Sequence, residues 1–288
     1  MIRAASGTDA PLTFHASAEG VKVYLDNFAL LEFAKGDSSR RQRLVTAFRR
    51  GANLLFSVGN AAELSGPQGA SSAALRTFLD ELGPHWYPVE LNPVEVVERE
   101  LRGAPEAESC LAKDFFRQYF VTRTSGYEPS SGRIIDLSEQ FYSLGAVIDW
   151  LVPQRESLRK ANAGLDAALI SKIGEYRVEF DRDPQSLDRA FPVLAFNSSK
   201  PATFAYVSLA RTLVLEAKAY KFMKGDGTDF CHSVMASAFS NFGTLDKQWK
   251  RRVEGLPQPN GLARIYYEPE LNQMVDDIES AVAQVIAT

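Results

Sequence analysis

The sequence predicts an α/β protein built on a mostly parallel β-sheet. Two segments near the N-terminus, 21–25 and 53–58, are rich in β-branched and aromatic residues, and a helical pattern follows each of them. Strands that alternate with helices pair in parallel through right-handed crossovers. A third observation supports this class: acidic residues stand where strand-like segments end or helices begin. In an open α/β sheet, strand ends converge there into a ligand crevice.

The first expected unit is a strand, an acid and a helix. The strand covers 21–25 and ends at Asp26, and Asn27 can start the turn into a helix over 28–35. A second helical segment is expected over 40–50, where apolar residues share one face and several arginines occupy the other.

A second strand and a second acid follow. The apolar run 53–58 is expected to be a buried strand that leads through Gly59 and Asn60 into a short helix carrying Glu63. Because parallel strands end at one edge of their sheet, Asp26 and Glu63 should emerge on the same side.

The middle of the chain has a different pattern. From 93 to 200 the sequence is mostly helical in period, with few strand-like runs. We interpret 93–200 as a large helical insertion into a discontinuous α/β core made of 20–92 and 201–288. Residues 1–19 mix Gly, Ser, Thr, Ala and Pro without a clear period, which indicates a loose N-terminal tail or an edge segment.

The core pattern returns with a long helix over 202–223. Asp229 then opens a helix that continues to about residue 239, and an acid in the first turn is electrostatically favoured. The other elements expected here are a strand over 241–245 that ends at Asp246, a basic helix start from Lys247, a strand over 262–267 and a helix over 270–286.

Composition excludes several classes of protein. No run approaches the roughly 20 apolar residues that span a bilayer, and residues 1–18 lack a basic-then-apolar signal, so we expect a cytoplasmic protein without a membrane partner. Cys110 and Cys231 lie far apart, which suggests neither a disulfide framework nor a zinc site. A formal net charge of −4 argues against coating nucleic acid through bulk positive charge.

Four acidic residues carry the functional hypothesis: Asp26, Glu63, Asp229 and Asp246. Carboxylates gathered at one sheet edge repel one another unless protons, basic side chains or divalent cations neutralise them. Hard oxygen ligands suit Mg²⁺ or Mn²⁺, so the sequence predicts a metal-dependent hydrolase. The alternative is structural, because the three aspartates could be ordinary helix caps and Glu63 a solvent-facing helix residue.

The order of these motifs resembles that of the PIN-domain nucleases. The matching segments are VYLDN (23–27), FSVGNAAEL (56–64), DGTDFCH (226–232) and TLD (244–246). The resemblance covers roughly 20–92 and 201–288, and the helical middle is longer than in compact family members. It implies a three-layer α/β/α sandwich with a PIN-like, mostly parallel sheet and a large helical insertion.

The resemblance also implies an activity and a cofactor. The four acids would be catalytic and would hold one or two Mg²⁺ or Mn²⁺ ions, with Asp226 as a candidate further ligand. The expected reaction is hydrolysis of phosphodiester bonds by a metal-activated water, most often in single-stranded RNA and less so in DNA. We therefore expect a metal-dependent endoribonuclease.

Further residues are candidates for supporting roles. Asn27, Ser57, Thr244 and His232 could orient carboxylates or waters, although ordinary turn or strand-end hydrogen bonds, and a structural histidine, explain them equally well or better. A basic group at the start of the helix after Asp246 could contact phosphates, the alternative being a solvated helix face. This group comprises Lys247, Lys250, Arg251 and Arg252.

Other α/β enzyme classes require motifs that this sequence lacks. A haloacid-dehalogenase-type phosphatase needs a second Asp two residues after the first, where this chain has Phe28, and neither a Gly-rich turn after Asp26 nor a P-loop is present. A non-enzymatic alternative stays open: a catalytically inactive PIN-like scaffold that binds RNA or a protein partner, or forms a homodimer, through the helical insertion.

Overall fold

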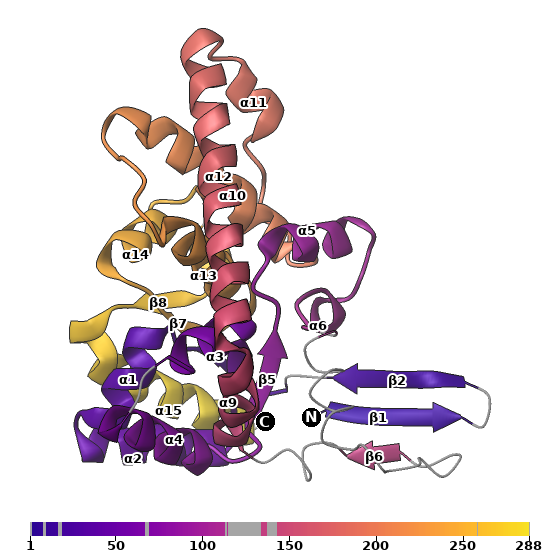
Figure 1. Cartoon of the computed structure of the whole chain (residues 1–288), viewed down its shortest axis with the longest axis vertical. Helices are drawn as coiled ribbons and strands as arrows, with labels where there is room; N and C mark the ends of the chain where they lie inside the picture. The colour runs from indigo at the N-terminus through magenta and orange to yellow at the C-terminus, as the bar shows by residue number, and fades with distance from the viewer. Residues whose placement is uncertain are drawn as a thin grey trace.

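Five parallel strands form the main sheet in the part of the chain that the structure describes (Figure 1). The computed structural model describes residues 2–7, 10–16, 19–66, 69–112, 114, 134–136, 143–257 and 259–287. The order β5-β4-β3-β7-β8 comprises β5 (Trp86–Val89), β4 (Ala52–Ser57), β3 (Val21–Tyr24), β7 (Phe242–Thr244) and β8 (Arg264–Tyr266). Each neighbouring pair is parallel, which confirms the expected α/β class.

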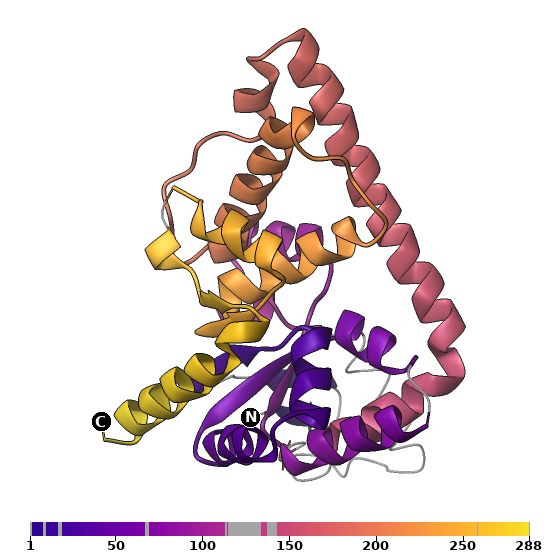
Figure 2. The same cartoon turned by 90° about the vertical axis from the view of Figure 1, so that its left-hand side faces the viewer.

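Helices cover both faces of this sheet (Figures 1 and 2). Alternate residues of a strand point to opposite faces: Val23 belongs to one hydrophobic core and its neighbour Tyr24 to the other. The first core contains α1 (Asn27–Lys35), α2 (Ser38–Arg49), α4 (Ala70–Glu81), α9 (Leu144–Leu151) and α15 (Leu271–Ala287). The second contains α5 (Pro93–Leu101), α10 (Arg155–Arg182), α12 (Pro201–Leu215), α13 (Asp226–Phe239) and α14 (Lys247–Glu254).

The central strands β3 and β4 each lead into a helix whose first turn is capped by a side chain. Asp26 is the N-cap of α1, and its Oδ1 accepts a hydrogen bond from the Ala29 backbone N–H at 3.2 Å. In the next unit, Ser57 and Asn60 form a capping box at the start of α3 (Val58–Leu64). Each strand therefore turns directly into a helix at the carboxyl edge of the sheet.

The helical middle is packed into both cores. Leu144 of α9 lies in the same core as α1 and α4, while Leu169 and Ile173 of α10 lie in the other. Helix α10 has 28 residues and runs as a long rod past the sheet to α11 (Ser186–Ala190), as Figures 1 and 2 show. Residues 113, 115–133 and 137–142 of the expected helical insertion lie outside the described residues.

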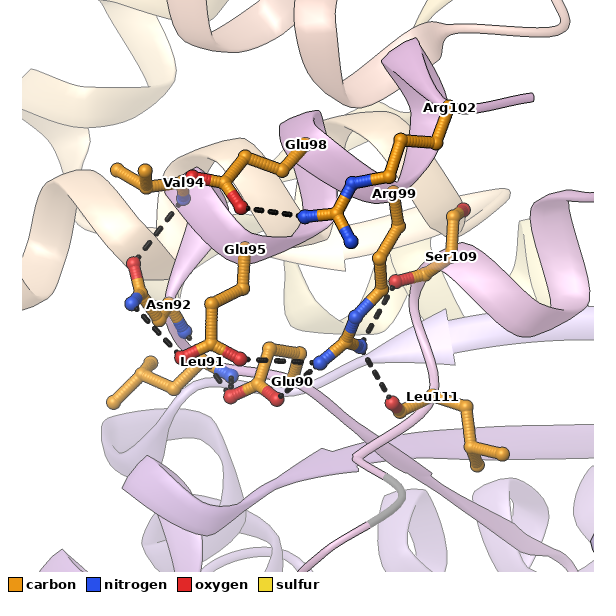
Figure 3. Close-up of polar contacts among 10 residues, drawn as sticks. All are labelled: Glu90, Leu91, Asn92, Val94, Glu95, Glu98, Arg99, Arg102, Ser109 and Leu111. Atoms are coloured by element: carbon orange, nitrogen blue, oxygen red, sulfur yellow. Dashed lines mark hydrogen bonds and ion pairs between the residues drawn. The ribbon is translucent and has the colours of Figure 1, made fainter. Parts of the chain in front are cut away.

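A polar junction around Arg99 joins β5 to α5 and α6 (Glu106–Ser109), as Figure 3 shows. The Arg99 guanidinium donates to the Leu111 carbonyl oxygen at 2.9 Å. It also lies 3.1 Å from a carboxylate oxygen of Glu95 and 3.4 Å from one of Glu90. These contacts fix the direction in which the chain leaves the sheet.

Within residues 1–19, where the sequence predicts a loose tail or an edge segment, the chain forms two strands of a second sheet, so the loose-tail prediction is corrected. Strands β1 (Ile2–Gly7) and β2 (Ala10–Ala16) pair antiparallel, and β6 (Ile134–Asp136) adds to β1. The third strand comes from a distant part of the chain, so the local composition of the N-terminus could not reveal the pairing. The chain also contains 3₁₀ turns at η1 (Val152–Gln154), η2 (Glu216–Lys218), η3 (Pro259–Gly261) and η4 (Glu268–Glu270).

Candidate functional site

Asp26 stands at the carboxyl end of the central strand, clamped by Thr244 from the end of β7. Asp26 Oδ1 accepts a hydrogen bond from the Thr244 hydroxyl at 2.9 Å, and the Asp26 backbone N–H donates back to the same hydroxyl oxygen at 2.9 Å. Burial, with a smaller contribution from the charge of Asp229, raises the pKa of Asp26 to about 7 despite these hydrogen bonds. The carboxylate is thus held rigidly in a place that disfavours its negative charge.

Asp229, in the first turn of α13, is the second perturbed acid. Its side chain is half-buried, and no hydrogen-bond donor reaches its carboxylate among the described residues. Burial raises its pKa to about 6, and the negative charges of Asp246, Asp226 and Glu63 act in the same direction. The fold therefore brings the four predicted acids close enough for their charges to interact.

Glu63 is oriented by a chain of hydrogen bonds that starts at the capping box of α3. The Ser57 hydroxyl donates to Asn60 Oδ1 at 2.8 Å, and the Asn60 amide donates to Asn27 Oδ1 at 3.3 Å. The Asn27 amide in turn donates to Glu63 Oε2. Ser57, Asn60 and Asn27 thus connect the two strand ends to the exposed Glu63 carboxylate, and Asn27 and Ser57 are candidates for orienting a carboxylate.

His232 lies one helical turn after Asp229 and is 5% exposed. Its Nδ1 is hydrogen-bonded to the hydroxyl of Tyr24, on the central strand. Its Nε2 is buried without a hydrogen-bond partner among the described residues, and the nearest carboxylate oxygen, Glu63 Oε1, is 3.9 Å away. That distance is too long for a hydrogen bond, so a buried nitrogen is left facing the acids without a protein partner.

The remaining two acids have structural hydrogen bonds. Asp246 caps α14, its Oδ1 accepting from the backbone N–H groups of Gln248 and Trp249, each at 2.8 Å. Asp226 is buried and uses both oxygens, accepting from the Tyr220 hydroxyl and from the Met223 backbone N–H. Asp246 keeps one oxygen that accepts no hydrogen bond from the described residues, whereas both oxygens of Asp226 accept one.

The four basic residues of α14 differ in exposure and in their ion pairs. Lys247 and Arg251 are exposed. Lys250 is held by Glu254 at 2.7 Å and Glu270 at 3.1 Å. Arg252 is buried, pairs with Glu216 at 2.9 Å, and lies over the rings of Tyr220 and Trp249. The expectation that Arg252 contacts nucleic acid is therefore corrected, because its guanidinium is enclosed by protein.

Two residues that the sequence did not single out shape the site. Tyr24 is one, through its contact with His232. The other is Asp166 on α10, a buried carboxylate that accepts from the backbone N–H groups of Gly225, Gly227 and Thr228 at 3.1, 2.8 and 3.2 Å. A Cβ at Gly227 would lie 2.5 Å from the Asp166 carbonyl oxygen, so only glycine permits this approach. The GDG sequence before Asp229 is the one local signal of such a contact.

The individual side chains of the site are suitable ligands for a divalent cation, but they do not form a ready-made ligand set. No three His, Cys, Asp or Glu side chains stand together as metal ligands in the described part of the chain. His232 Nε2 and the Asp229 carboxylate, which have no hydrogen-bond partner among the described residues, could nonetheless act as ligands of a cation. A cation would also offset the cost of ionising Asp26. No helix of the described residues is long and apolar enough to cross a membrane.

Comparisons of the chain with protein-family models, with curated proteins and with solved structures found no match. The geometry and electrostatics of this site are therefore what bears on its function.

Proposed function

We propose that the protein is a Mg²⁺- or Mn²⁺-dependent nuclease of the PIN-like kind that hydrolyses phosphodiester bonds, preferentially in single-stranded RNA. One observation carries the proposal: the buried His232 Nε2 faces the acids at the carboxyl edge of a parallel sheet and has no partner among the described residues. The raised pKa values of Asp26 and Asp229 support it, since both carboxylates would gain from a positive charge between them.

Asp26, Glu63 and Asp229 would hold the ion or ions, with the free oxygen of Asp246 as a fourth donor. A bound ion would supply a water of lowered pKa as the nucleophile. The chain's own residues have positioning roles: Thr244 fixes Asp26, and Asn27 fixes Glu63. His232 Nε2 would hydrogen-bond a phosphate oxygen, because Tyr24 occupies its other ring nitrogen.

A second candidate is the catalytically inactive scaffold that binds RNA or a protein partner through α10. The observation that favours it is the lack of a preassembled ligand set among the described residues. The two candidates differ in whether RNA is cut, so a cleavage assay separates them.

A mixed pool of single-stranded RNA, incubated with Mn²⁺ and with or without EDTA, tests the proposal. We expect the wild-type chain to cleave in Mn²⁺ alone, leaving 5′-phosphate and 3′-hydroxyl ends, and Asp229→Asn to be inactive. Asp181→Asn, an exposed acid at the far end of α10, is the matched control and should keep full activity. Cleavage that persists in EDTA, or equally in Asp229→Asn, would exclude the proposed site, and RNA binding without cleavage would favour the scaffold.

A further inference from the structure

A cavity of about 470 Å³ lies beside the acids, between α3, α10 and the loop that enters α13. Glu63 forms part of its wall, so the cavity adjoins the candidate metal ligands. Its volume falls within the roughly 300–1,000 Å³ typical of sites for small molecules. Four of its nine lining residues come from the helical middle of the chain, whose role the proposed function leaves unassigned.

Two cations line the cavity from different elements. Arg159 projects from α10 and Lys224 from the loop before α13. Both are exposed, and neither has an ion pair among the described residues. Two acids, Glu63 and Asp166, also line the cavity, but neither forms an ion pair with these cations among the described residues. The Asp166 carboxylate accepts from three backbone N–H groups at the start of α13, and Glu63 accepts from the Asn27 amide. The cavity therefore offers two free positive charges to an anionic group.

Neutral hydrogen-bonding groups complete the wall. Asn162 of α10 carries an amide that can both donate and accept, and Thr228 of α13 carries a hydroxyl with the same capacity. Ala62 and Ala163 leave room between them. A free phosphate would occupy a small part of this volume and leave the amide and hydroxyl unused, whereas a sugar and a base would use them.

We propose that this cavity binds one nucleotide, with its phosphate between Arg159 and Lys224 and its sugar or base against Asn162 and Thr228. The assignment of that nucleotide to the substrate strand, next to the scissile bond, rests on the proposed function. The nucleotide site itself does not, because it uses residues outside the acid cluster.

Isothermal titration calorimetry with adenosine 5′-monophosphate in EDTA, where no cleavage can occur, tests this site directly. We expect the wild-type chain to bind the nucleotide and the double variant Arg159→Ala/Lys224→Ala to bind it about ten-fold more weakly or worse, since charge-assisted contacts to phosphate are lost. Both side chains are exposed and unpaired, so the variant should fold, which circular dichroism would verify.

The matched control is Lys160→Ala/Lys221→Ala. It removes two exposed charges from the same helix and loop, at positions outside the cavity wall, and should leave the affinity unchanged. An equal loss of nucleotide affinity in the control would overturn the proposal, because it would show that the overall positive charge, and not this cavity, binds the nucleotide. So would absence of binding by the wild-type chain, or equally tight binding of adenosine or of inorganic phosphate. Loss of nucleotide affinity in the double variant supports the site even if RNA is never cleaved, so this proposal and the nuclease proposal can fail separately.

Discussion

The Tyr24 hydroxyl and His232 Nδ1 are hydrogen-bonded across 208 residues of sequence, joining the central strand to the helix that carries Asp229. Both side chains are buried, and burial raises the pKa of Tyr24, so its hydroxyl stays protonated at physiological pH. This contact leaves His232 with a single ring nitrogen for the acidic crevice.

Tyr24→Phe should free the His232 ring while preserving its packing. We expect a loss of about 1 kcal/mol in the free energy of unfolding, typical of one hydrogen bond. The ¹⁵N chemical shifts of the His232 ring should report a changed tautomer balance, and any cleavage activity should fall in kcat with KM retained. Tyr206→Phe, which removes another partly buried hydroxyl, is the control and should leave the ring shifts as they are. Identical His232 spectra in wild type and Tyr24→Phe would contradict the role of Tyr24.

Asp26 should make stability depend on pH in the absence of metal. Its pKa is raised from 3.8 to about 7, so the folded protein binds this proton more tightly than the unfolded chain does. The stability it contributes is present below pH 4 and is lost as the pH rises to about 7. Asp26→Asn removes this titration. Urea unfolding in EDTA at pH 4.5 and pH 7.5 should show a smaller loss in the variant; an equal loss in both proteins would refute the prediction.

Mn²⁺ should stabilise the wild-type chain by mass action. Saturation at 100 times Kd adds about 2.7 kcal/mol, enough to raise Tm by several degrees. At pH 7.5 we expect this shift in wild type and in Asp181→Asn, and its loss in Asp229→Asn. The shift should shrink at pH 5, because protons compete for Asp26 and Asp229 below their raised pKa values of about 7 and about 6. No shift with either Mn²⁺ or Mg²⁺ would leave the scaffold alternative in place.

Asp166→Ala should destabilise the protein although the residue lies in the helical middle. Three backbone N–H groups at the start of α13 lose their acceptor, which should lower the free energy of unfolding by about 2–4 kcal/mol. Asp181→Ala, an exposed acid on the same helix, should be neutral. The midpoints of urea unfolding are compared. Matching midpoints for the two variants would show that the hydrogen bonds of Asp166 to the start of α13 contribute nothing to stability.

Arg252→Ala should act on stability. The guanidinium fills a space between Tyr220 and Trp249 and neutralises Glu216, so its removal should lower the free energy of unfolding by about 2–4 kcal/mol. Its exposed neighbour Arg251, changed to Ala, should alter stability by less than about 0.5 kcal/mol. Denaturant unfolding of both variants checks this. If Arg252→Ala were as stable as the wild type, the structural role of Arg252 would be refuted.

Much of the fold follows from local patterns. The strand at 21–25, the acid after it and the helix beyond correspond to β3 (Val21–Tyr24), Asp26 and α1 (Asn27–Lys35). The strand expected over 241–245 is β7, within a residue or two at each end. Alternating burial and helix caps are encoded by adjacent residues, so the sequence alone places these elements and the edge at which Asp26 emerges.

Tertiary contacts decided which side chains at that edge are free to act. The sequence gives Asp226, Asp229 and Asp246 similar positions, yet the fold supplies donors to Asp226 and Asp246 and none among the described residues to Asp229. It likewise encloses Arg252 and exposes Arg251. The donors to Asp226 and Asp246 are near in sequence, whereas Arg252 is held by Glu216, 36 residues away, and the start of α13 by Asp166, 61 residues away. A periodic pattern determines that a residue is buried, while the partner that satisfies its hydrogen bonds is determined by how separate elements pack.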